Sequence, residues 1–177
     1  MASFKDRIIR ASKLDVHLYE EVESDKEAMG QAMLVVVLSS IAAGVGSIAR
    51  GGMSGILIGT ISSLIGWYVW AYLTYFIGAK ILPEPETRAD HSELLRTVGF
   101  SSSPGLIRVL GIIPLLAVPV FFIASLWMLA AMVIAVRQAL DYKSTLRAIG
   151  VCLIGWIIQF VILALMFAVF GSIVKPG

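Results

Sequence analysis

Charged residues are scarce in this sequence. Asp, Glu, Lys and Arg make up 15% of its 177 residues, whereas about a quarter of the residues in soluble domains are charged. The remainder is strongly apolar, with 58% hydrophobic residues and a mean hydropathy of +0.89. The net charge is only +2 and no Lys- or Arg-rich run is present, so we expect no nucleic-acid partner. Lipid is the expected solvent for most of the chain.

Cysteine and histidine are nearly absent as well. The single cysteine, Cys152, lies inside an apolar run, which excludes an intrachain disulfide and a cysteine-based metal site. The two histidines, His17 and His91, lie in polar segments. The centres of the apolar runs carry no ionisable side chain of the kind that builds a proton relay or a coupling-ion site. We therefore expect no cofactor, no metal and no enzymatic activity.

One short motif resembles that of an enzyme. Residues 52–55, Gly-Met-Ser-Gly, resemble the GxSG motif of rhomboid intramembrane proteases. A nucleophilic serine needs a base within hydrogen-bond reach. The topology derived below places Ser54 on the opposite side of the membrane from both histidines, so we interpret the motif as small-residue packing.

Four long apolar stretches follow the polar N-terminal segment. Residues 28–49 are uncharged and number 22, close to the length that crosses the hydrocarbon core. Residues 53–82 are long enough to tilt or protrude, and their second half is rich in Trp and Tyr, which is typical of an interfacial belt. Residues 104–136 contain Pro114 and Pro119 and are too long for one span but short for two. The last stretch covers residues 148–174.

The distribution of basic residues decides how the 104–136 stretch crosses the membrane. If it forms a hairpin that turns near residues 117–119, twelve of the fourteen Lys and Arg residues lie on the cytosolic side, and only Arg50 and Lys175 lie opposite. If the stretch forms a single kinked helix, ten Lys and Arg residues lie on the cytosolic side and four on the opposite side, which is a weaker bias. The positive-inside rule therefore favours five spans, at about residues 28–49, 53–82, 102–117, 119–137 and 148–174. We predict an all-α, multi-pass bundle in the cell membrane, with a transmembrane domain over residues 28–177, a cytosolic N-terminus and the C-terminus on the opposite side.

Residues 1–27 form a cytosolic amphipathic segment in this prediction. They lack the apolar core of a signal peptide, so we expect the N-terminus to be retained. Apolar residues recur at near-helical spacing, which indicates an interfacial helix on the membrane surface or, equally, packing on the protein's own cytosolic loops. Two capping boxes are predicted, Ser24 with Glu27 before the first span and Asp90 with Glu93 before a short interfacial helix.

Candidate contact residues fall into three groups. The basic residues of the cytosolic face are candidates for binding anionic headgroups or protein partners: Arg7, Arg10, Arg96, Arg108, Arg137, Lys143 and Arg147. We expect Arg108 to lie one or two helical turns from the cytosolic interface. A stripe of small residues could let two helices approach closely, within the chain or in a homodimer: Gly51, Gly55, Gly59 and Ser63. Two glutamines lie inside the spans, where hydrogen bonds to neighbouring helices are expected: Gln31 and Gln159.

The motif at residues 99–104, Gly-Phe-Ser-Ser-Ser-Pro, resembles the G-Y-x-x-x-P motif at the start of the third span of the Yip family of five-span membrane proteins. Gly99, Phe100 and Pro104 carry the resemblance. Further blocks at residues 14–22, 66–78, 108–114 and 127–140 are similar to the compact prokaryotic branch of that family. The resemblance implies a non-enzymatic protein, since eukaryotic members bind lipidated Rab-type GTPases and each other. The D-L-x-G-P motif of those members has no match, with Asp15-Val16-His17-Leu18-Tyr19 the nearest stretch, so a GTPase partner is not carried over.

These observations favour a non-catalytic membrane protein that serves as a scaffold or as a membrane-organising, partner-binding protein. Its working surface is expected on the cytosolic face, built from residues 1–27, 83–103 and 137–147. The expected partners are the bilayer, including anionic lipids, and other membrane proteins or further copies of the chain. The alternative hypothesis is an oligomeric channel or small-solute permease, whose path would be lined by Gln159, Arg108 and the tyrosines of the second span.

Overall fold

The computed structural model describes residues 3–170, with the side chains of residues 49–51, 163 and 165–170 outside the description. This part of the chain is helical throughout and contains no strand. In chain order the elements are α1 (Phe4–Ser12), α2 (Val16–Ser24), α3 (Ala28–Gly46), α4 (Ile48–Tyr75), the π-helix η1 (Phe76–Ile81), α5 (His91–Phe100), the 3₁₀ helix η2 (Ser103–Ile112), α6 (Pro114–Ala139) and α7 (Thr145–Phe170).

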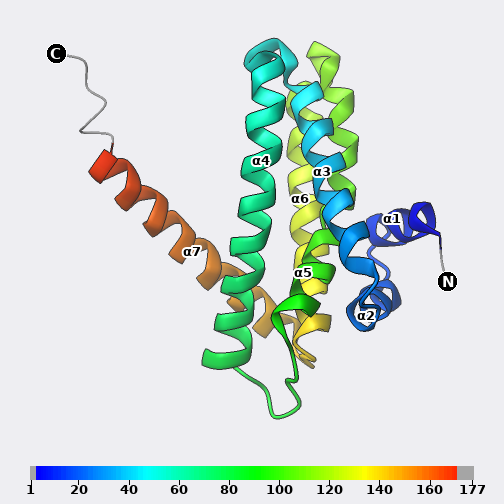
Figure 1. Ribbon diagram of the computed structural model, residues 1–177, viewed down its shortest axis with the longest axis vertical. Helices are drawn as coiled ribbons and strands as arrows, with labels where there is room; N and C mark the ends of the chain where they lie inside the picture. The colour runs from blue at the N-terminus through cyan, green and yellow to red at the C-terminus, as the bar shows by residue number, and fades with distance from the viewer. Residues whose placement is uncertain (1–2, 171–177) are drawn as a thin grey trace.

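The long helices run along one axis. In Figure 1, α3, α4 and α6 lie along the long axis of the molecule, α7 diverges from them, and α1 lies across the axis. Four segments are long and apolar enough to cross a membrane: Ala28–Gly46, Gly52–Ile81, Pro114–Ala139 and Thr145–Ile162. The predicted class, an all-helical bundle with several apolar membrane helices, is thus confirmed. The number of spans and their orientation stay predictions, and the end of the last predicted span, residues 171–174, lies outside the described residues.

Residues 91–112 form a composite element that returns along the bundle. It consists of α5 followed by η2, and η2 packs between α3 and α6. A 3₁₀ helix rises about 2.0 Å per residue, so the ten residues of η2 reach about 20 Å, where an α-helix of the same length would reach about 15 Å. This steeper rise explains how a stretch too short for two α-helical spans still accommodates a hairpin.

The chain reverses direction at Ile113. Its backbone is extended (φ −83°, ψ 113°), as the residue before a proline prefers, and Pro114 then opens α6 in the first turn, where its missing N–H costs nothing. The reversal therefore lies before Pro114 and not at residues 117–119 as predicted. Pro119 sits inside the continuous helix α6. The alternative of one kinked helix over residues 104–136 is wrong.

The two predicted capping boxes have different outcomes. At α5 the Asp90 carboxylate accepts a hydrogen bond from the Glu93 N–H at 2.9 Å and the Glu93 carboxylate accepts from the Asp90 N–H at 2.7 Å, which confirms the box. The Ser24 box is wrong. Ser24 ends α2, and its hydroxyl donates back to the carbonyls of Glu20 and Glu21.

The buried core lies at one end of the bundle. One cluster joins the C-terminal ends of α4 and α6 to α5 and the start of α7, with Ile77, Leu94 and Leu140 fully buried. A second cluster packs the N-terminal helices onto α3, with Leu18 and Tyr19 fully buried. The other half of the bundle exposes large apolar side chains, as expected where lipid is the solvent.

The N-terminal helices therefore pack on the protein itself. The buried face of α1 and α2 contacts α3, α5, α6 and η2. Of the two arrangements that the sequence leaves open, the structure supports packing on the chain's own segments. Exposed apolar side chains remain on α1 and at the start of α2, namely Ile9 and Val16.

Candidate functional site

Three polar segments that are distant in sequence meet at the buried end of the bundle. Lys143 Nζ lies 2.7 Å from Glu86 Oε1, and Gln138 Nε2 donates to Glu20 Oε1 at 3.0 Å. The first contact joins the turn after α6 to the loop after η1, and the second joins the end of α6 to α2. We call this surface the polar cap and define it as α1, α2, residues 83–90, α5 and residues 137–147. The distribution of basic residues in the sequence predicts that the same three segments lie on one side of the membrane.

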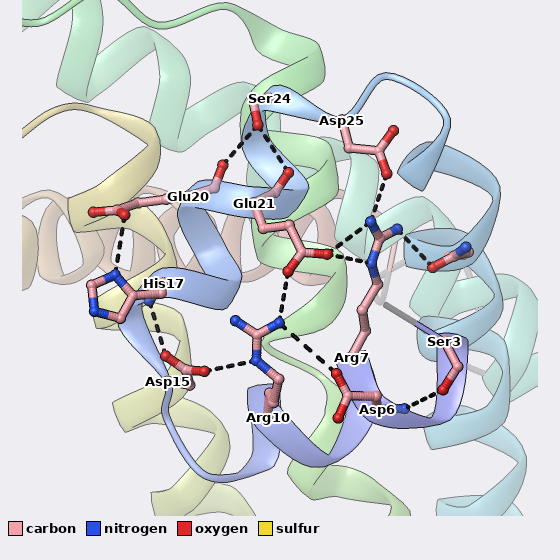
Figure 2. Close-up of polar contacts among 11 residues, drawn as sticks. Ser3, Asp6, Arg7, Arg10, Asp15, His17, Glu20, Glu21, Ser24 and Asp25 are labelled. Atoms are coloured by element: carbon pink, nitrogen blue, oxygen red, sulfur yellow. Dashed lines mark hydrogen bonds and ion pairs between the residues drawn. The ribbon is translucent and has the colours of Figure 1, made fainter. Parts of the chain in front are cut away.

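Arg7 organises the N-terminal part of the polar cap (Figure 2). Its guanidinium is buried and donates to Asp25 Oδ2 at 2.7 Å, to Glu21 Oε1 at 2.9 Å and to Gln31 Oε1 at 3.0 Å. The hydrogen bond from Arg7 holds the pKa of Asp25 below its ordinary value. Since Gln31 belongs to α3, Arg7 ties α1 to α2 and to the first membrane helix at once.

Arg10 completes this ion-pair network. It donates to Asp15 Oδ2 at 2.8 Å and to Glu21 Oε2 at 2.6 Å. Burial alone would raise the pKa of Glu21, but the hydrogen bonds from Arg10 and Arg7 outweigh it and lower that pKa. The two arginines thus neutralise neighbouring acids within the molecule.

Arg96 clamps the end of α2 onto α5. Its side chain is buried, Nε donates to the Val22 carbonyl at 2.9 Å, and Nη2 donates to the Glu23 carbonyl. The last carbonyls of a helix have no partner within the helix and carry partial negative charge, so a buried guanidinium there is well placed. The signal for this role in the sequence is a single arginine between the apolar Leu95 and Val98.

The remaining candidate bases of the polar cap also have internal partners. Arg137 donates to the carbonyls of Tyr142 and Lys143, and Arg147 lies 3.5 Å from the Glu84 carboxylate. Six of the seven candidate bases, all except Arg108, are therefore engaged inside the molecule. Among the residues whose side chains are described, four exposed lysines form no ion pair: Lys5, Lys13, Lys26 and Lys80.

Tyr142 secures the π-helix η1, a contact that the sequence did not reveal. Its hydroxyl lies 2.6 Å from the Leu82 carbonyl and 3.0 Å from the Gly78 carbonyl. Burial raises the pKa of Tyr142. A π-turn misaligns the regular helical hydrogen bonds, and the phenol supplies a partner for the carbonyls at its end. The turn after α6 is thereby attached to the end of α4.

The tyrosines of α4 surround His91. Its ring lies 5.0 Å from that of Tyr68, 5.6 Å from Tyr72 and 6.4 Å from Tyr75. Burial lowers the pKa of His91, against the opposing effect of Asp90. Ser54 precedes Tyr72 on the same helix by about 27 Å at 1.5 Å per residue, so Ser54 and His91 are far apart.

Arg108 lies away from α5 and from the turn after α6, although its helix η2 also contacts α1. Its carbonyl contacts Gly46 at the end of α3, where a Cβ would collide with it, and its guanidinium lies 5.8 Å from the ring of Phe121. The expected position close to the cytosolic interface is therefore corrected. Gly46 is fourteen residues beyond Ala32, which α5 contacts, and this places Arg108 about 21 Å further along the bundle.

Arg108 and Gln159 line one cavity with a volume of about 450 Å³. The predicted small-residue stripe lines it too: a Cβ added at Gly55 or Gly59 would meet nothing within 4 Å, and Ser63 belongs to the lining. The stripe thus borders open space and does not bring α4 against α3. Gly51 lies outside the residues whose surroundings are described. Among the described residues, none of the three tyrosines around His91 lines this cavity.

The motif at residues 99–104 has a packing explanation. A Cβ on Gly99 would lie 2.8 Å from the Cβ of Ala32, so glycine allows α5 to cross α3 closely. Phe100 is completely buried in the N-terminal cluster, and Pro104 is buried in the first turn of η2. These three residues set the crossing of α5 over α3 and the start of the 3₁₀ helix.

Within the described residues, no group of three or more His, Cys, Asp or Glu side chains is arranged to hold a metal ion. The fold and the polar cap define an all-helical, multi-pass membrane protein. The family model described as the Yip1 domain matches residues 18–166, and the chain belongs to this family. Neither a curated protein nor a solved structure matches the chain.

Proposed function

We propose that this protein is a non-catalytic scaffold that organises the membrane through its polar cap on the cytosolic side, with α1 in contact with anionic lipid. The observation that carries the proposal is an exposed stripe formed by Lys5 and Ile9 on α1 and by Lys13, the residue directly after this helix. These residues follow one another at four-residue spacing, opposite the face that buries Arg7.

The position of α1 suits such a contact. The helix lies across the bundle axis (Figure 1). At the end of α1, the Ser12 carbonyl accepts a hydrogen bond of 2.8 Å from the Trp127 indole of α6. Because Arg7 points toward α2, the Lys5-Ile9-Lys13 stripe faces away from α2. An interfacial helix places its apolar side chains at the acyl boundary and its lysines among the headgroups in this way.

The structure shifts the proposed headgroup contacts from arginines to lysines. Arg7 and Arg10 form ion pairs with Glu21, Asp15 and Asp25, which neutralise their charge within the molecule. Lys5 and Lys13 are exposed, and near an anionic surface each would contribute about 1 kcal/mol. The arginines supply rigidity to the polar cap and the lysines supply its attraction to lipid.

A fluorescent label on α1 tests the lipid contact in the full-length protein. Ile9→Cys, in a Cys152→Ala background, is labelled with an environment-sensitive dye and reconstituted into vesicles of phosphatidylcholine with or without phosphatidylglycerol. We expect a blue shift that is larger in the anionic vesicles and that falls when Lys5 and Lys13 are both changed to Gln.

A label at His17→Cys provides the matched control, since the His17 side chain is 84% exposed on α2 and lies outside the stripe. Its emission should be the same in both vesicle types. Identical emission from the Ile9 label with and without phosphatidylglycerol would contradict the proposal, as would insensitivity to the double lysine change.

A further inference from the structure

The cavity beside Arg108 is separate from the ion-pair network of the polar cap, although Val98 of α5 contributes to its lining. It lies between α3, α4, η2, α6 and α7, and its volume of about 450 Å³ falls within the range of ligand pockets. Gly55 marks one end of its α4 wall and Trp70 the other, and the helical rise between them gives a length of about 22 Å. The cavity is therefore long and narrow.

Two polar groups of the cavity lining have no hydrogen-bond partner. Arg108 Nε and Trp70 Nε1 line the cavity, are fully covered and have no hydrogen-bond acceptor among the described residues. Trp70 as a whole is only 6% exposed. A buried N–H without an acceptor is costly, and the half-buried Arg108 guanidinium lacks an anionic partner.

No ion pair or hydrogen bond joins Arg108 to an acid in the described part of the chain. All twelve Asp and Glu residues lie at or before residue 27, between residues 84 and 93, or at Asp141. Asp141 and Glu93 belong to the polar cap, about 20 Å or more from Arg108 along the bundle. A second copy of the chain would bring the same acid-free spans. The anion that complements Arg108 therefore comes from outside the protein.

The remaining lining combines apolar side chains with serine hydroxyls and the Gln159 amide. Gly55, Gly59 and Ser63 leave open space along α4, and Trp156 and Met132 close the far end. The guanidinium thus lies at one end of a channel lined by apolar and small polar side chains, near the end of α3. This arrangement matches an amphiphile whose charged head sits at a membrane surface and whose tail runs into the hydrocarbon.

We propose that this cavity binds an anionic phospholipid from the leaflet opposite the polar cap. Arg108 binds the phosphate, and one acyl chain lies along Gly55, Gly59 and Ser63 toward Trp156. The lipid supplies the charge that the chain lacks and fills the space that the small residues leave.

Native mass spectrometry of the full-length protein in detergent tests the proposal, with equimolar phosphatidylglycerol and phosphatidylcholine as probes. We expect retained phosphatidylglycerol adducts, reduced at least roughly tenfold by Arg108→Gln because a charge-assisted contact is lost. Gly59→Leu should also reduce them, since its side chain would occupy the channel without a backbone collision. Phosphatidylglycerol with brominated acyl chains should quench tryptophan fluorescence in the unmodified protein and quench it less in Gly59→Leu.

Matched controls are Arg88→Gln, an exposed arginine of the polar cap, and Gly30→Leu, a glycine with nothing within 4 Å that lies outside the cavity. Both should retain the adducts. Equal retention of the two lipids, or unchanged adducts in Arg108→Gln and Gly59→Leu, would overturn the proposal. It would likewise fail if inorganic phosphate alone displaced the adducts fully, or if Arg108→Gln abolished a dimer and left lipid binding intact.

Discussion

Arg96 of α5 donates a hydrogen bond to the carbonyl of Val22, the buried third-last residue of α2, at 2.9 Å. The contact joins two segments more than seventy residues apart and holds the end of α2 in place. It makes α2 part of the bundle and not a loosely attached arm.

Replacing Arg96 by Met should therefore release α2. The change leaves the Val22 and Glu23 carbonyls without their donor, at a cost of about 1–3 kcal/mol. We expect faster hydrogen exchange over residues 16–24, measured by mass spectrometry in detergent. Arg88→Ala, which removes an exposed side chain, should leave that exchange unchanged. Slow exchange over α2 in the Arg96 variant would show that the clamp is dispensable.

The Arg7 network predicts sensitivity to acid. The pKa of Asp25 is lowered by its hydrogen bond from Arg7, so its contribution to stability is present above its ordinary pKa of about 4 and is lost as the pH falls through the lowered value. Arg7→Met should lower the thermal midpoint at pH 7, and the difference from the unmodified protein should shrink toward pH 3. Circular dichroism in detergent gives both midpoints, and a difference that is constant with pH would contradict the prediction.

Glu23 predicts the opposite dependence. Burial raises its pKa to about 8, assisted by Asp141 and Glu93, with Glu20 adding a smaller effect and Arg96 opposing it. A raised pKa means that the stabilising contribution is complete below the unfolded value near 4.5 and is lost as the pH rises through about 8. Glu23→Gln should thus match the unmodified protein near pH 5 and have the higher thermal midpoint at pH 9.

The exposed Glu27 provides the control for this experiment. Glu27→Gln should change the midpoint little at either pH. If Glu23→Gln lowered the midpoint at pH 9, the carboxylate would be stabilising in its charged form, contrary to the prediction.

Gly99 predicts a steric coupling with Ala32. Gly99→Ala would place a Cβ 2.8 Å from that of Ala32, and overpacking of this kind costs about 1–3 kcal/mol. Ala32→Gly in the same chain should restore part of the loss, because the Ala32 carbonyl oxygen remains 3.1 Å from the new Cβ. A double-mutant cycle of thermal midpoints measures this coupling.

Gly30→Ala is the matched control on α3, since nothing lies within 4 Å of its added Cβ. It should be neutral or stabilising through helix propensity, by up to about 1 kcal/mol. Additive effects of the Gly99 and Ala32 changes would show that the close crossing does not depend on glycine.

Local sequence signals predicted those features of the structure that depend on residues close to one another in the sequence. The Asp90 and Glu93 capping box and the apolar helices follow from periodicity and composition. The same reasoning gave a false box at Ser24, because α2 continues through Ser24 and Asp25 accepts the Glu27 N–H at 3.0 Å instead. The two segments match the capping-box pattern equally well, and only the tertiary fold shows which of them forms the box.

Tertiary contacts also decided the rest of the site. Positive charge indicated one polar face, but the sequence could not tell that Arg7 and Arg10 would meet acids on the following helix. It also could not place Arg108, because the depth of that residue depends on the rise of a 3₁₀ helix. The glycine and serine stripe signalled close helix packing, whereas its open side became the wall of a cavity.

The 3₁₀ helix η2 has a consequence for how this protein is made. Its ten residues are about half the apolar length that enters a bilayer independently, and they include Arg108. We expect η2 to remain outside the lipid during synthesis until α6 has emerged, so that the two segments enter together as a hairpin. The placement of η2 would then depend on a helix that the ribosome makes after it.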